Sequence, residues 1–152
     1  MTGWPGPVTS AERARSWGPA LLAAYALLWL ALAIEPRFRQ DWLLENLLVF
    51  AAVPWLAHRW RRAPFSNLAT AGLFVFFSLH ALGAHYTYSE VPYDAWWRAL
   101  TGHALDGSGQ GAARNHFDRA VHFSYGLLVA PAALELLERA TQPRGLWRWL
   151  LP

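Results

Sequence analysis

The chain has 152 residues, of which 55% are hydrophobic and only 15% are charged, and its formal net charge is +3. Soluble domains carry about 25% charged residues, and the arginines here are scattered between long apolar runs, so disorder, nucleic-acid binding and most soluble enzymes are excluded. No residue is Cys, which excludes disulfides and thiolate chemistry. The composition predicts a protein of the lipid bilayer.

Four apolar stretches predict transmembrane spans in a single domain covering residues 1–152; they are about 17–34, 42–57, 67–84 and 118–137. Lipid cannot satisfy backbone N–H and C=O groups, so each span is expected to be a helix. The predicted fold class is therefore an all-α, multi-pass transmembrane helix bundle of about four spans. A long exoplasmic loop, 85–117, is expected between spans three and four, and 143–152 resembles the start of a fifth span.

Arginine positions predict the orientation of these spans. Eight arginines lie before the first span, between spans two and three, or after span four, namely Arg13, Arg15, Arg59, Arg61, Arg62, Arg139, Arg144 and Arg148. The opposite side holds Arg37, Arg39, Arg98 and Arg114, with Arg119 at a helix end. Because cytoplasmic loops carry the excess of Lys and Arg, both termini are predicted to be cytoplasmic.

A second interpretation of the N-terminus remains open. Residues 1–33 have features of a cleaved signal peptide, with Arg13 and Arg15 as its charged region and Ala31-Leu32-Ala33 as a small-residue cleavage site. This interpretation would leave three spans, and it would not move the polar residues considered next.

Ionisable residues inside spans usually mark an interior site or pathway. Glu45 lies near the exoplasmic end of span two, His80 and His85 near that end of span three, and Asp118 and His122 in the first turns of span four. With a rise of 1.5 Å per residue, all five fall within roughly 10 Å of the same boundary. The spacing therefore predicts one polar site built from three helices.

The predicted site has the chemistry of a metal centre. His80, His85, Asp118 and His122 offer imidazole and carboxylate ligands suited to a divalent ion such as zinc or iron. Glu45, Asn46, Tyr86, Arg114, Asn115 and Arg119 complete the candidate polar site. Metal-assisted hydrolysis or oxidation of a lipid-like substrate, oriented by Tyr86 and Arg114, is one expected activity.

Structural roles for the same residues are the alternative. Asp118 can cap its helix and pair with Arg114 or Arg119. His80 can be a buried hydrogen-bonding histidine, and Glu45 can pair with Arg119 or bond to Asn46. Asn115 is placed as the N-cap of span four. Under this hypothesis the protein is not an enzyme, and the polar residues form a network that holds the helices together or binds a small ligand.

Two segments carry a family resemblance. SLHALGAHYTYSEVP at 78–92 and RNHFDRAVHFSYG at 114–126, with Glu45-Asn46 in WLLENLL, resemble the signature segments of the YjdF-type bacterial inner-membrane protein family, a domain of unknown function. The resemblance runs from about Trp42 to Trp149. It implies an integral protein of the bacterial inner membrane and supplies no established reaction, substrate or cofactor.

The chain also departs from this family pattern. Members of the family usually continue past the fourth span with two more spans, whereas this chain stops at Pro152. The resemblance therefore implies a form truncated after the fourth span. Its expected partners are the lipid bilayer together with a second copy of the chain or the missing C-terminal half.

Overall fold

The computed structural model describes residues 17–105 and 115–141, and these residues contain five α-helices and no strand. The helices are α2 (Gly18–Leu32), α3 (Arg39–Arg62), α4 (Asn67–Tyr86), α5 (Tyr93–Thr101) and α6 (Phe117–Thr141). The all-α class is thus confirmed for this part of the chain. Arg114, the outer arginines Arg13, Arg15, Arg144 and Arg148, and the segment 143–152 lie outside the described residues.

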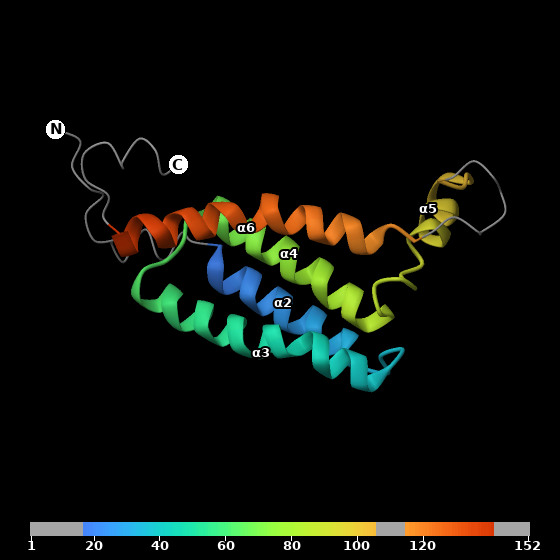
Figure 1. Ribbon diagram of the computed structural model, residues 1–152, viewed down its shortest axis with the longest axis horizontal. Coiled ribbons are helices and arrows are strands. Elements are labelled where there is room, and N and C mark those ends of the chain that lie inside the picture. Colours follow the sequence, from blue (N-terminus) through green and yellow to red (C-terminus); the bar gives the residue numbers. More distant parts are fainter. Residues whose placement is uncertain (1–16, 106–114, 142–152) are drawn as a thin grey trace.

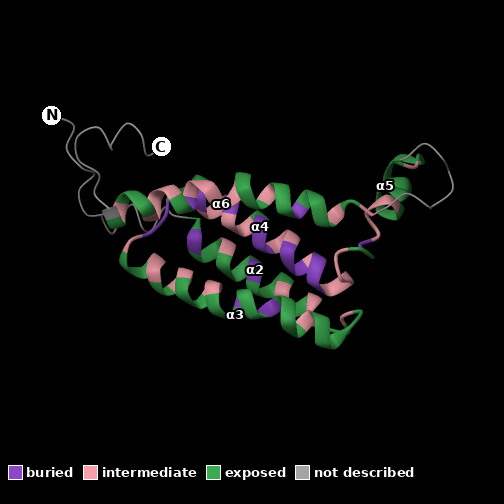
Figure 2. Ribbon diagram, viewed as in Figure 1, coloured by how far each residue is buried: buried purple, intermediate pink, exposed green. Residues whose placement is uncertain are grey.

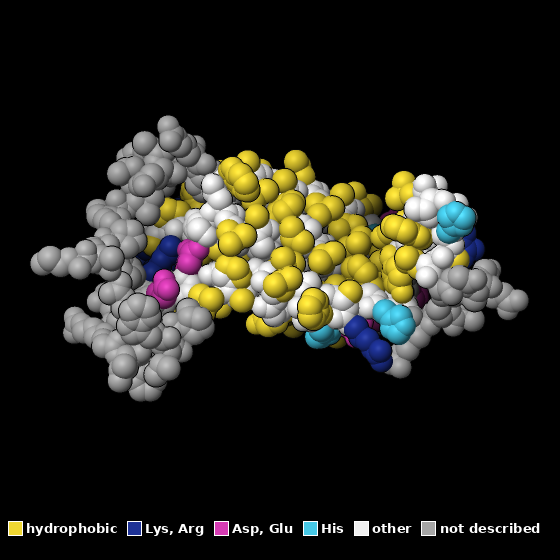
Figure 3. Space-filling model, turned by 90° about the horizontal axis from the view of Figure 1, so that it is seen from above, with side chains coloured by type: hydrophobic (Ala, Val, Ile, Leu, Met, Phe, Trp, Pro, Cys, Tyr) yellow, Lys and Arg dark blue, Asp and Glu magenta, His cyan; other side chains and the backbone are white. Residues whose placement is uncertain are grey.

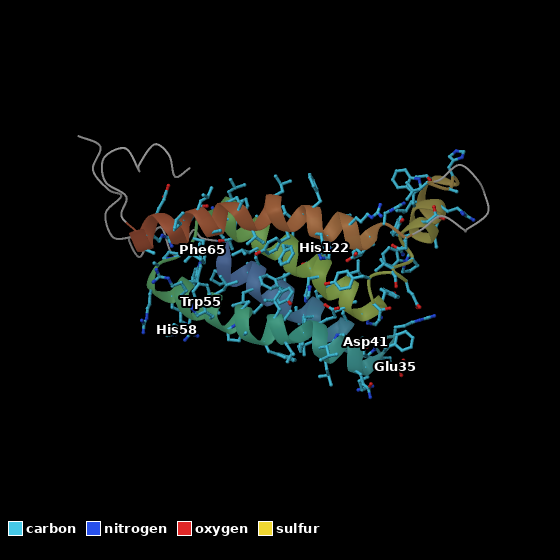
Figure 4. The ribbon with its side chains drawn as sticks, in the orientation of Figure 1. Glu35, Asp41, Trp55, His58, Phe65 and His122 are labelled. Carbon is cyan, nitrogen blue, oxygen red and sulfur yellow. The ribbon has the colours of Figure 1, made fainter. Side chains whose placement is uncertain are left out.

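The four long helices lie alongside one another and alternate in direction, so that each connection reverses the chain (Figure 1). We call the end where α2 and α4 begin and α3 and α6 end the arginine end (residues 17–18, 58–67 and 135–141). The opposite end, where α3 and α6 begin, is the histidine end (residues 32–46, 80–93 and 115–122). Figure 4 shows His58 and Phe65 near the first and Glu35 and Asp41 near the second.

Helix α4 is the centre of the bundle and contains more buried residues than any other helix (Figure 2). Phe76, Phe77 and Ala81 of α4 pack with Tyr25 of α2 and with residues of α3 and α6 in one core cluster. Gly72 allows the close approach of α6, because a Cβ built on it would lie 2.3 Å from the backbone oxygen of Leu128. Small residues at such crossings are typical of helices that pack in membranes.

The connection between α3 and α4 is tied to α6 at the arginine end. The Arg139 guanidinium donates to the backbone oxygens of Ala63 at 3.0 Å and Pro64 at 2.9 Å, and to the Glu135 carboxylate at 2.9 Å. The Glu135 carboxylate also accepts from the backbone N–H of Ser66, whose side chain caps α4 by accepting from the N–H of Ala69. These contacts hold the start of α4 against the end of α6.

The surface between the two ends is apolar. Figure 3 shows hydrophobic side chains over the middle of one face, with charged and His side chains gathered towards its ends. Among the described residues, α4 and the Phe117–Ala140 part of α6 are long and apolar enough to cross a membrane, whereas α2 is apolar but shorter. These features are typical of a helical membrane protein.

A helix covers most of each apolar stretch of the sequence, and the boundaries differ at the ends. The stretch at 42–57 lies within α3, which begins earlier, at Arg39, and continues through Pro54 to Arg62. The predicted loop 85–117 is not wholly irregular, because it contains α5. Tyr93, Trp96, Trp97 and Leu100 recur at helical spacing and give α5 one apolar face, which an amphipathic helix requires.

Candidate functional site

His80 is the centre of the polar contacts at the histidine end. It lies in α4 with only 6% of its surface exposed. Its Nε2 is 3.1 Å from the backbone oxygen of Glu45, and its Nδ1 is 2.5 Å from the Tyr88 hydroxyl. A carbonyl can only accept, so Nε2 carries the hydrogen of the neutral ring, and Nδ1 accepts from the Tyr88 O–H. Both ring nitrogens are thereby engaged within the protein.

Tyr88 reaches His80 because the chain reverses sharply after α4. Thr87 and Tyr88 both have left-handed backbone angles, with φ of 54° and 50°, and the Tyr88 N–H donates to the Gly83 oxygen at 2.7 Å. The tyrosine ring then lies directly over Gly83, where a Cβ would be 2.5 Å from the ring. Burial, reinforced by the negative charges of Glu45 and Asp118, raises the pKa of the Tyr88 phenol and keeps it a donor.

Asn46 forms a second contact between helices, deeper in the fold. Its side chain is fully buried in α3. The amide oxygen accepts from the Trp29 indole N–H of α2 at 2.6 Å, and the amide nitrogen donates to the Trp42 backbone oxygen at 2.7 Å. The Trp29 ring also packs against Trp42 and Phe50. A buried amide with both ends satisfied fixes the register of α2 against α3.

His85 and Tyr86 close the histidine end. The His85 Nδ1 donates to the Leu32 oxygen at 2.8 Å, and the His85 oxygen accepts from the backbone N–H of Arg37 at 2.9 Å. These two bonds join the end of α4 to the connection between α2 and α3. The Tyr86 ring packs edge-on against the rings of His85 and Trp96, and so links α4 to α5.

Asn115 and Asp118 organise the start of α6. The Asn115 side chain accepts from the Phe117 N–H at 3.0 Å, as in an Asx turn, and donates to the Val91 oxygen at 2.9 Å. Because α6 begins at Phe117, Asn115 lies one residue before the N-cap position that the sequence predicted for it. Asp118 pairs with His122 one turn later, with 3.0 Å between Oδ1 and Nδ1. The side chains of this pair are 54% and 77% exposed, so they lie on the surface of the bundle and not beside His80.

The predicted residues therefore do not converge on one point. His80, Asn46 and His85 bind different partners inside the fold, and His122 faces outwards. Glu45 and Arg119 are exposed, and the Glu45 contribution to the His80 contact comes from its backbone oxygen. Among the described residues, no group of three or more His, Asp or Glu side chains is placed to hold a metal ion.

Sequence reasoning missed two partners in these contacts, Trp29 and Tyr88. Trp29 lies in an uncharged apolar stretch, where the sequence does not distinguish an indole that makes a buried hydrogen bond from one that faces lipid. Tyr88 stands eight residues after His80, a spacing that no regular helix brings together, and Gly83 between them was the only available sign of a close approach. The folded-back turn that joins Tyr88 to His80 depends on two left-handed residues that are not glycine.

Comparisons with known proteins place the chain in a family. The family described as "Predicted membrane protein (DUF2238)" matches residues 19–152. The chain is 30% identical over 112 residues to "Inner membrane protein YjdF" of Escherichia coli (strain K12). The aligned part covers 74% of this chain and 49% of that relative, so the chain spans about half the length of the curated protein it matches. No solved structure matches the chain significantly. This chain belongs to the DUF2238 family of membrane proteins.

Proposed function

We propose that this chain is a non-enzymatic, four-span module of the bacterial inner membrane, in which the polar residues of the histidine end form a structural hydrogen-bond network. The spans are α2, α3, α4 and α6. Each of these helices has a stretch without Asp, Glu or Arg, at 18–32, 46–57, 67–86 and 120–134, with charged residues beyond its ends. At 20 residues, the stretch of α4 has the length that the hydrocarbon layer of a bilayer requires. The other three stretches have 12 to 15 residues, so their helices span the layer only together with the polar residues at their ends.

The distribution of arginines supports an orientation with both termini in the cytoplasm. Arg59, Arg61, Arg62 and Arg139 lie at the arginine end, and the sequence adds four more arginines before α2 and after α6. Short segments rich in Lys or Arg remain on the cytoplasmic side during insertion. The histidine end, with α5, then faces the exoplasmic side, and the exposed Trp96 and Trp97 of α5 suit the headgroup layer.

One observation carries the structural role of the network: both nitrogens of the buried His80 ring are occupied by partners from other parts of the fold. A metal ligand needs a free ring nitrogen, and a general base needs one that faces a substrate. Interhelical hydrogen bonds in membranes are worth about 0.6–2 kcal/mol each, so contacts such as those of His80, His85 and Asn46 stabilise the bundle without any catalysis. The alternative, a metal-dependent hydrolase or oxidase, has no supporting observation among the described residues.

Cysteine labelling in whole cells tests the topology, because the chain has no Cys of its own. We expect Ala95→Cys in α5 to react with a membrane-impermeant maleimide in intact cells. Ala63→Cys, between α3 and α4, should react only after the membrane is opened. Labelling of both sites in intact cells, or of Ala63→Cys alone, would contradict the proposed orientation.

Elemental analysis tests the non-enzymatic role. Protein purified in detergent without chelators should contain zinc, iron and manganese far below one ion per chain, and His80→Ala should not change those values. The same variant should lower the thermal midpoint, because the Tyr88 hydroxyl and the Glu45 carbonyl both lose their partner. One ion per chain, lost in His80→Ala, would replace the structural role with a metal site.

A further inference from the structure

A cavity of about 270 Å³ opens between α2, α3 and α4 near the arginine end. Its lining is mostly apolar and includes Tyr25, Ala57, Trp60, Arg61, Phe65 and Phe77. At 1.5 Å per residue, Phe77 lies about 15 Å along α4 from Asn67, so the cavity extends from the arginine end towards the middle of the bundle. Apolar cavities of about 150 Å³ already bind small hydrocarbons, so this space is large enough for a ligand.

Two buried polar atoms distinguish this cavity from a packing defect. The hydroxyl of Tyr25 and the indole N–H of Trp60 are buried, and neither has a hydrogen-bond partner among the described residues. Tyr25 itself is only 6% exposed. Leaving a buried donor without a partner costs about 1–3 kcal/mol, and both residues line the cavity. Both can donate, so the missing partner is an oxygen acceptor.

Besides its apolar lining and its two buried donors, the cavity has a third feature, which is positive charge. Arg61 also lines the cavity, and Arg59 and Arg62 are its neighbours at the end of α3. A ligand that satisfies all three features has an apolar chain, one or two accepting oxygens near its polar end, and a negative charge. A glycerophospholipid with an anionic headgroup has this order of groups along its length: acyl chain, ester carbonyl and phosphate.

We propose that this cavity binds one acyl chain of an anionic phospholipid, with ester carbonyls accepting from the Tyr25 hydroxyl and the Trp60 indole and the phosphate facing Arg61. Phe65 and Phe77 supply apolar walls for the chain. The site is separate from the His80 contacts, which lie at the other end of α4. It makes the bundle a selective lipid binder and not only a passive occupant of the bilayer.

Native mass spectrometry of the full chain tests this site. The protein is first delipidated and then mixed with either phosphatidylglycerol or phosphatidylcholine that have identical acyl chains. We expect the parent protein to retain one phosphatidylglycerol with an occupancy several-fold above that of phosphatidylcholine. Ala57→Phe fills the cavity and Tyr25→Phe removes one donor, so both should lower phosphatidylglycerol retention at least five-fold. Arg61→Gln should abolish the preference for the anionic lipid.

Matched variants outside the cavity control for general effects on the fold. Three variants should retain lipid as the parent does: Ala51→Phe on the exposed side of α3, Tyr125→Phe on the surface of α6, and Arg39→Gln at the opposite end of α3. If Ala57→Phe fails to fold, the result for Tyr25→Phe decides whether the site exists, because this variant loses a single oxygen atom and is expected to fold. Equal retention by the parent and Tyr25→Phe, equal loss in the control variants, or one-for-one displacement by a quinone would each overturn the proposal.

Discussion

The polar groups inside the two ends of the bundle differ in whether they have hydrogen-bond partners. At the histidine end, the side chains of His80, His85 and Asn46 all bind backbone or side-chain partners from neighbouring segments. At the arginine end, the Tyr25 hydroxyl and the Trp60 indole N–H are buried beside a cavity, and neither has a hydrogen-bond partner among the described residues. Satisfied polar groups stabilise a fold, whereas buried unsatisfied ones lower its stability, and the proposed lipid would supply an acceptor for both.

A difference in connectivity accompanies this contrast. At the arginine end, Arg139 and Glu135 of α6 hold the short α3–α4 connection. The start of α2 is joined to α4 there by the bond from the Trp17 N–H to the Asn67 side-chain oxygen at 3.3 Å, and α2 borders the cavity. At the histidine end, His85 ties α4 to the α2–α3 connection, and Asn46 ties α3 to α2. Helix α2 therefore meets buried polar groups with partners at the histidine end and a cavity at the arginine end. The following predictions test this asymmetry, beginning with the largest effect.

Gly83→Val should be the most damaging change at the histidine end. Its side chain would overlap the Tyr88 ring, which lies 2.5 Å from a Cβ at this position, and would push the hydroxyl away from His80. We expect a loss of about 3 kcal/mol, the upper end of the range for overpacking, measured by reversible unfolding in detergent. Gly126→Val on α6 is the control, because a Cβ there meets nothing within 4 Å. Similar losses in both variants would argue against a specific Tyr88 contact.

Asn46→Leu should lower the free energy of unfolding by about 2 kcal/mol, because the Trp29 indole N–H is then left buried without an acceptor. The fluorescence of the variant should also change, since the Trp29 ring is released from a fixed position against Trp42. Gln40→Leu, at an exposed position near the start of α3, should change stability far less. An Asn46→Leu variant as stable as the parent would show that this amide does not fix α2.

Tyr88→Phe removes only the hydroxyl that donates to His80, and it should lower stability by about 1 kcal/mol. A double-mutant cycle with His80→Leu measures the coupling between the two residues. We expect a coupling free energy of about 1 kcal/mol, equal to the loss in Tyr88→Phe alone, because the two side chains share one hydrogen bond. Additive effects would mean that the hydroxyl and the ring do not act together.

Tyr25→Phe, the matching change at the arginine end, should leave stability in lipid-free detergent within about 0.5 kcal/mol of the parent. The Tyr25 hydroxyl has no partner among the described residues, so removing it breaks no bond and relieves the cost of burial. The contrast with Tyr88→Phe is the sharpest test of the asymmetry between the ends. A loss equal to that of Tyr88→Phe would indicate that the Tyr25 hydroxyl is bonded in the absence of lipid.

Much of the helical architecture could be predicted from the sequence, because the lengths of uncharged apolar runs indicate helices directly. The stretch at 67–84 corresponds closely to α4, and Ser66 supplies the cap that begins it. Helix α5 was missed because it has only nine residues and lies within the stretch 85–117 that the sequence predicted as a loop. Its apolar face, Tyr93, Trp96, Trp97 and Leu100, is too short a pattern to be recognised as a helix from the sequence.

The sequence predicts at which end of the bundle the candidate-site residues lie, but not which way their side chains point. Sequence position places His80, His85 and the Asp118–His122 pair near one end of the bundle, where the structure also has them. Which way each side chain points depends on the rotation of each helix about its axis, and this rotation is set by packing. His80 faces inwards because the Phe76 and Phe77 side of α4 packs against the other helices, whereas His122 faces outwards on α6.

The sequence by itself determined that this chain is helical and apolar and that its charged residues gather at helix ends, since composition and hydrophobic run length are local properties. It also carried the family signature through the segments around His80 and Asp118. Only the tertiary structure decided that the polar residues bind separate partners, that Tyr88 folds back over Gly83, and that a cavity with unpaired donors opens beside Tyr25. These outcomes depend on contacts between residues far apart in the chain, which packing geometry alone selects.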